Sequence, residues 1–275
     1  MSLDTFLLGY TFSSLSYILA VIVLVLPHYI GPSLILTRIR FYNMMFTQWT
    51  SFTCVWILIS AGIERALTSA MPHKDHSGTS RQAWIIVSIV TFISLISALP
   101  VLWEYRVVTS DLSPYQSAQT NASNYLIKRP STAEKSEFHV VYFCYISSLF
   151  VYLPYFLAIV TCISLGTNSR RLRLNLRPIY RTTRGVILNR KISEEIAASK
   201  LLIIVLIAYV ISSAPLTVVN FLANPIIGKV DLNDDVIILV CNVLAVWYHI
   251  YYVIQQQLYF CYNKQYRLTM LTWCC

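Results

Sequence analysis

Charged residues are scarce in this sequence. Asp, Glu, Lys and Arg make up 12% of its 275 residues, against roughly a quarter in an average soluble domain. Hydrophobic residues make up 56% and come in long blocks separated by polar loops. Blocks of this kind are typical of membrane-spanning helices, because lipid offers no partner for unpaired backbone groups. The scarcity of charge therefore excludes an ordinary soluble domain and indicates an integral membrane protein.

Catalytic and metal-binding patterns are also lacking. The seven cysteines follow no zinc spacing, so we expect no metal and no cofactor. Apart from His249, the histidines form no constellation near one face that an enzyme would need; they are His28, His73, His76 and His139. We therefore expect no enzyme. A six-helix transporter or channel subunit stays an alternative, although only His249 is ionisable and well inside a span.

Six apolar blocks each reach the ~20 residues that a bilayer core requires. They predict an all-α integral membrane bundle with six transmembrane helices, forming one domain over residues 1–275. The expected spans are Thr5 to Leu26, Met44 to Ala66, Ala83 to Tyr105, His139 to Gly166, Leu201 to Ala223, and Val236 to Phe260.

The loop charges predict the orientation. When Glu64-Arg65, the loops 67–82 and 167–200 and both termini share one side, that side holds 14 of the 21 Lys and Arg and 5 of the 12 acids. The positive-inside rule makes this side cytoplasmic and leaves both termini inside. We expect a multi-pass protein of the plasma membrane. The basic loop 167–200 favours either anionic lipid head groups or a cytosolic protein as its partner, and not nucleic acid.

Two modification sites fit this orientation. Asn121-Ala122-Ser123 is an acceptor for N-glycosylation in the loop 106–138, which the charges place outside. Cys274 and Cys275 end a stretch that fits a helix lying in the inner interface, where palmitoylation is plausible.

Several motifs together resemble the rhodopsin-type G-protein-coupled receptors, and within them the invertebrate FMRFamide-type neuropeptide receptors. Glu64-Arg65-Ala66 resembles the family's Asp/Glu-Arg-Tyr, and Pro154 and Pro215 resemble its fifth- and sixth-helix prolines. Tyr259, followed by Arg267, resembles the seventh-helix tyrosine and the start of the membrane-surface helix. Leu99-Pro100 with Trp103-Glu104-Tyr105-Arg106-Val107 resembles that subgroup's fourth-helix end.

The resemblance begins at the family's second helix, so the six spans correspond to helices two to seven. We expect a truncated product in preference to a six-helix variant. The family's second-helix aspartate falls at Ser14, its Asn-Pro at Gln255-Gln256 and its aromatic switch residue at Ser213. These departures make a non-signalling receptor remnant an alternative.

The resemblance implies a receptor for an extracellular ligand that signals to a heterotrimeric G protein. Glu64, Arg65, Glu195 and Tyr259 are then the coupling and activation residues, with an Arg65–Glu195 ion pair as the latch of the closed state. The other interpretation of Glu194 and Glu195 is that they are acids at a helix N-terminus, favoured by the helix dipole.

The same comparison implies a ligand site in the outer half of the bundle. Aromatic rings and a carboxylate suit a peptide that ends in Arg-Phe-amide, with Glu104 taking the arginine. Ordinary helix packing is the alternative role of these rings, and a satisfied core histidine that of His249. The candidate ligand residues are Gln48, Phe52, Trp103, Glu104, Asn220, Tyr248 and His249.

Overall fold

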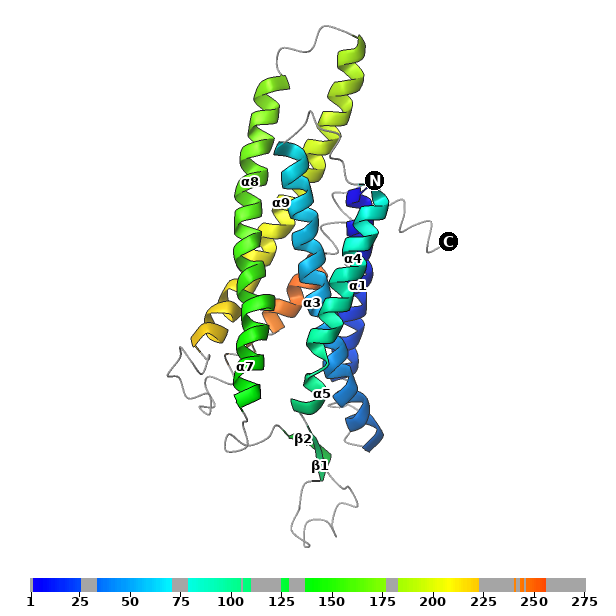
Figure 1. Cartoon of the computed structure of the whole chain (residues 1–275), viewed down its shortest axis with the longest axis vertical. Helices are drawn as coiled ribbons and strands as arrows, with labels where there is room; N and C mark the ends of the chain where they lie inside the picture. The colour runs from blue at the N-terminus through cyan, green and yellow to red at the C-terminus, as the bar shows by residue number, and fades with distance from the viewer. Residues whose placement is uncertain are drawn as a thin grey trace.

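The computed structural model describes residues 2–25, 34–70, 79–104, 106–109, 125–128, 137–176, 183–222, 240, 243–244 and 246–255. Long helices lie side by side along one axis (Figure 1). The elements are α1 (Ser2–Val25), α3 (Leu34–Ala70), α4 (Ser80–Ala98), α5 (Val101–Glu104), β1 (Arg106–Thr109), β2 (Tyr125–Lys128), α7 (Glu137–Ile146), η2 (Ser147–Tyr152), α8 (Leu153–Leu176) and α9 (Thr183–Leu222). Residues 246–255 are also helical.

Within these described residues, four helical segments are long and apolar enough to cross a membrane. They are Leu3–Val25, Ile35–Ala70, Ser80–Ala98 and Cys144–Arg171, and a shorter apolar segment covers Ser199–Pro215. Large apolar side chains cover much of their outer surface; on α1, for example, Phe12 is 75% and Leu19 63% exposed. Such a surface suits lipid, and the predicted membrane helical bundle is confirmed.

The helices run past the predicted spans. The second span was expected from Met44, but α3 begins at Leu34. The fifth was expected from Leu201, but α9 begins at Thr183 and contains Pro215 inside it. The interpretation of Glu194 and Glu195 as N-terminal helix acids is therefore wrong, because both lie about three turns inside α9. Hydropathy locates the apolar part of a helix, whereas its polar turns continue into the water.

The third predicted span is divided in two. A capping box at Thr79 and Gln82 begins α4, with the Thr79 side chain accepting from the Gln82 N–H. At its other end the Leu99 N–H bonds to the carbonyls of Leu95 and Ile96, and Pro100 follows. Pro100 has no N–H with which to continue the hydrogen-bond ladder of α4, and the short helix α5 starts separately at Val101.

The fourth predicted span contains a π-helical segment. Its parts are α7, η2 and α8, and η2 ends two residues before Pro154. Proline has no N–H, so a carbonyl one turn earlier loses its usual donor. A π turn next to proline is a recognised way for a helix to absorb this loss.

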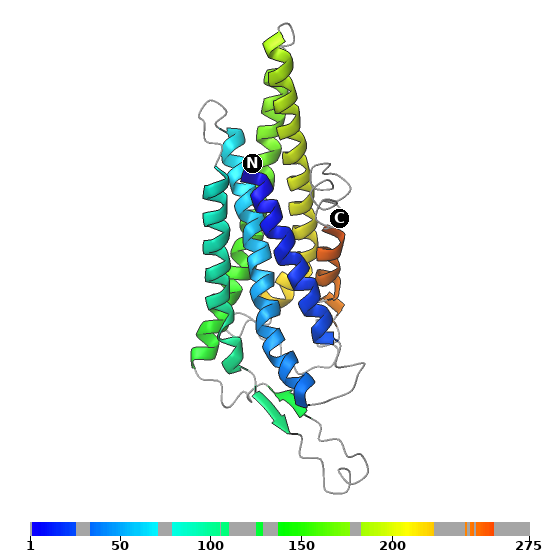
Figure 2. The same cartoon turned by 90° about the vertical axis from the view of Figure 1, so that its right-hand side faces the viewer.

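An antiparallel hairpin, β1 with β2, lies at one end of the bundle (Figure 2). Its register pairs Arg106 with Lys128 and Thr109 with Tyr125. Loop composition did not predict these strands. The last turns of α3, with Arg65, lie at the opposite end of the bundle (Figure 1), and we call the two ends the hairpin end and the Arg65 end.

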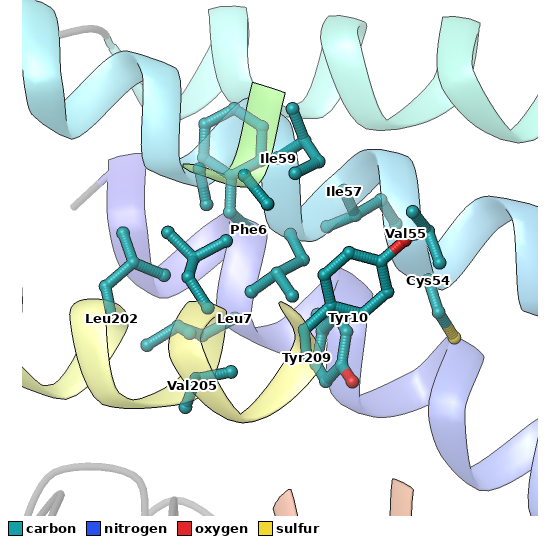
Figure 3. Close-up of a cluster of buried hydrophobic side chains, with 14 of the residues drawn as sticks. Phe6, Leu7, Tyr10, Cys54, Val55, Ile57, Ile59, Leu202, Val205 and Tyr209 are labelled. Carbon is teal, nitrogen blue, oxygen red and sulfur yellow. The ribbon is translucent and has the colours of Figure 1, made fainter. Parts of the chain in front are cut away.

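The buried core lies where α1, α3 and α9 meet. Figure 3 shows Phe6, Leu7 and Tyr10 of α1 close to side chains of α3 and α9. Cys54, Ile59, Val205 and Leu206 expose none of their surface. Because lipid is as apolar as these side chains, tight packing and interhelical hydrogen bonds stabilise this core more than the hydrophobic effect does.

Candidate functional site

The last turns of α3 place an acid and an arginine side by side at the Arg65 end. Arg65 Nε lies 3.8 Å from Glu64 Oε2, and their side chains are 15% and 16% exposed. That separation makes an ion pair too long for a hydrogen bond. The Arg65 side chain is therefore mostly covered in this structure.

Asn168 of α8 is hydrogen-bonded to the last turns of α3. Its Nδ2 donates to the carbonyl of Ala66 and to Ser69 Oγ, both at 3.3 Å. It therefore bonds to the backbone of the residue that follows Arg65. Asn168 was not singled out from the sequence. The feature that could have indicated it is its position between the apolar and the basic parts of α8.

A polar cluster of tyrosines lies deeper in the bundle, where α1 meets the helix 246–255. The Tyr10 hydroxyl donates to Gln255 Oε1, and the Tyr17 hydroxyl is hydrogen-bonded to His249 Nδ1. These two hydrogen bonds join α1 to the helix 246–255 at two places along its length. Gln255 is fully buried. Its amide oxygen therefore needs a hydrogen-bond donor inside the bundle, and the Tyr10 hydroxyl supplies it.

Ring contacts extend this tyrosine cluster to α9, and a contact between hydroxyl groups extends it to α3. The Tyr17 and Tyr252 ring centroids lie 4.4 Å apart, and those of Tyr209 and Tyr251 lie 6.0 Å apart. The Tyr252 hydroxyl lies 2.9 Å from that of Tyr248 and 3.5 Å from Ser51 Oγ. Four helices thus share one continuous set of rings and hydroxyl groups.

The candidate ligand residues that the structure describes already have neighbours within the bundle. Phe52 stacks on Phe150 of η2, with ring centroids 4.0 Å apart and planes at 16°. Tyr248 and His249 belong to the tyrosine cluster. Gln48, on the same helix as Phe52, is half-buried.

The remaining predicted residues fall into two groups. Glu195 and Asn220 lie in α9, and Trp103 and Glu104 in α5, but their side chains are outside the described part. Tyr259, Asn121, Cys274 and Cys275 lie outside the described residues altogether. Within the described part, no group of three or more His, Cys, Asp or Glu side chains is placed to hold a metal ion.

Comparison with known proteins places the fold. No family model matches the chain, and no curated protein matches its sequence. Among solved structures it matches a rhodopsin, so the described helices have the fold of a rhodopsin-like receptor. The matching structure is the crystal structure of squid rhodopsin, with a TM-score of 0.70 at 12% sequence identity, covering 100% of this chain and 76% of that chain.

Proposed function

We propose that this protein is a G-protein-coupled receptor of the plasma membrane that responds to an extracellular peptide. The observation that carries the proposal is the rhodopsin fold matched over the chain, with the Glu64–Arg65 pair near the C-terminal end of α3. An arginine with a fixed positive charge at a helix boundary is suited to contact a cytosolic protein once it is uncovered.

The proposed mechanism has two states. In the closed state Arg65 is held beside Glu64 and is 15% exposed. A ligand that binds better to a form with separated inner helix ends shifts the population toward that form, and Arg65 becomes available to the G protein. Glu195 of α9 serves as the further partner of Arg65 in the closed state, which makes it part of the latch.

The proposed ligand is a peptide of the FMRFamide type. Phe52, Phe150 and Trp56 provide an aromatic group between α3 and η2, which suits a phenylalanine ring. Glu104 ends α5 at the hairpin end and supplies a carboxylate for the peptide's arginine. Cells that express the chain with a G-protein dissociation sensor test this, using one peptide with an Arg-Phe-amide, an Arg-Phe free-acid or an Ala-Phe-amide end.

We expect a response to the Arg-Phe-amide peptide and at least tenfold weaker potency for the other two. Glu104→Gln should lower potency, whereas Glu137→Gln, at the start of α7 on the same end, should not. Equal responses to all three peptides would contradict the proposed ligand class. A chain that reaches the surface but responds to no peptide and activates no G protein would contradict the receptor function.

A further inference from the structure

Three helices meet at Gly62 of α3. A Cβ atom built on Gly62 would lie 2.7 Å from Cγ2 of Thr161 in α8 and 3.3 Å from Cδ1 of Leu206 in α9. Thr161 is 4% exposed and Leu206 fully buried. Gly62 therefore occupies a contact that even an alanine side chain would overfill.

The neighbours of Gly62 have little freedom to move away. Thr161 is branched at Cβ and has few allowed rotamers in a helix, and its backbone is part of α8. A methyl group at 2.7 Å must push Thr161 away from α3, and interiors packed to this density transmit such strain to the helix that carries the side chain.

The same contact face continues to the Arg65 turn. Positions 62, 66 and 69 of α3 lie on one face at helical spacing, as do positions 161, 165 and 168 of α8. At 165 the leucine is fully buried, and at 168 the asparagine bonds to the Ala66 carbonyl and to Ser69 Oγ. Arg65 follows Gly62 by three residues, about 4.5 Å along the helix axis.

We propose that Gly62 is the closure point of the Arg65 end: by lacking a side chain it lets α8 and α9 pack against α3 and keep Arg65 covered. This inference rests on the proposed receptor function and names its regulation. The small size of residue 62 then keeps the open form rare in the absence of ligand. Any added volume at this position shifts the population toward the open form.

The test compares Gly62→Ala with Gly166→Ala. Both changes replace a helical glycine and gain the same intrinsic helix propensity, but a Cβ at Gly166 meets nothing within 4 Å. Guanine-nucleotide exchange without ligand is measured for each variant at matched surface amounts. We expect Gly62→Ala to raise basal exchange about fivefold or more, and Gly166→Ala to leave it at the wild-type level.

A second change gives a specific rescue. Thr161→Ser deletes Cγ2, the atom nearest to the added Cβ, and keeps the hydroxyl. The double variant Gly62→Ala/Thr161→Ser should return basal exchange toward the wild-type value. If Gly62→Ala does not reach the membrane, Thr161→Ile, which replaces the hydroxyl by a larger ethyl group on the α8 residue of this contact, takes its place and should raise basal exchange.

A distance measurement separates this proposal from the receptor function. Spin labels at Leu67 and Arg170, both exposed on α3 and α8, report the separation of the two helices by pulsed electron paramagnetic resonance. We expect a longer distance in Gly62→Ala and recovery with Thr161→Ser, even if no variant activates a G protein. An unchanged distance, or an equal change in Gly166→Ala, overturns the closure proposal while leaving the receptor function standing.

Discussion

At the scale of single residues, polar side chains in the core define which helices belong together. The Tyr17–His249 and Tyr10–Gln255 hydrogen bonds join residues more than 200 positions apart in the sequence. In lipid a buried hydroxyl or amide has few other partners, so such pairs specify one arrangement of helices. The structure thus gives His249 a partner inside the bundle, which is what the core-histidine interpretation expected.

Removal of the Tyr17 hydroxyl tests this arrangement. Tyr17→Phe keeps the ring and leaves His249 Nδ1 without the bonded hydroxyl. We expect the free energy of unfolding to fall by about 0.6 kcal/mol, the average for hydrogen bonds between membrane helices, and by no more than about 1.7 kcal/mol, the largest such value. Unfolding titration in bicelles measures the loss. Tyr42→Phe, at a residue that is 61% exposed, serves as the control. Equal losses in the two variants would contradict a specific role for the Tyr17 hydroxyl.

Residue types predicted the tyrosine cluster only in part. Tyr248 and His249 were singled out as outer-half candidates, but Tyr10, Tyr17 and Gln255 were not. Residues 248, 251, 252 and 255 lie on one helical face. Because this face carries tyrosines and a glutamine, the spacing indicated that these polar groups are buried together. Which residues of α1 would meet them depends on the helix register across the bundle, and no local pattern encodes it.

At the scale of elements, hydropathy found the helices but not their ends or their irregularities. The apolar cores of α1, α3, α4 and α8 were predicted. The extra polar turns of α9 and the hairpin were not. Near Pro154 the helix contains the π turn of η2, which the sequence did not predict. A proline shows where a donor is missing, but the way the backbone compensates depends on its neighbours.

The η2 segment brings Phe150 onto Phe52, and this contact is testable. Phe150→Leu keeps apolar volume but removes the stacked ring, so we expect the free energy of unfolding to fall by about 0.5 to 1.5 kcal/mol. Phe156→Leu, at a position that is 62% exposed on α8, should change it little because lipid replaces the ring contacts there. A Phe150→Leu variant as stable as Phe156→Leu would show that the stack does not hold η2 against α3.

At the scale of the whole molecule, charge counting and the motifs near the Arg65 end predicted the fold that the comparison with squid rhodopsin supports. The prediction of a helical bundle succeeded because lipid restricts a chain of this composition to helices. The residues that contact a ligand are harder to predict than the fold, because aromatic side chains occur both in helix packing and in ligand binding.

The orientation has its own test. If the loop 106–138 is outside, Asn121 receives a glycan when the chain is made in animal cells. We expect the wild-type chain to lose apparent mass on treatment with a glycosidase, and Asn121→Gln to run at the deglycosylated position with or without it. A wild-type chain that is insensitive to the enzyme would contradict an exposed outer loop at this site.

We propose that Arg65 transmits a signal to a G protein when the inner helix ends separate. This is tested by guanine-nucleotide exchange on a purified heterotrimeric G protein, catalysed by the purified chain in lipid nanodiscs with the Arg-Phe-amide peptide present. We expect the wild-type chain to accelerate exchange over empty nanodiscs, and Arg65→Ala to remove the acceleration while Arg171→Ala, at an exposed arginine of α8, retains it. Exchange by Arg65→Ala at the wild-type rate would contradict the claim, as would a wild-type chain no faster than empty nanodiscs.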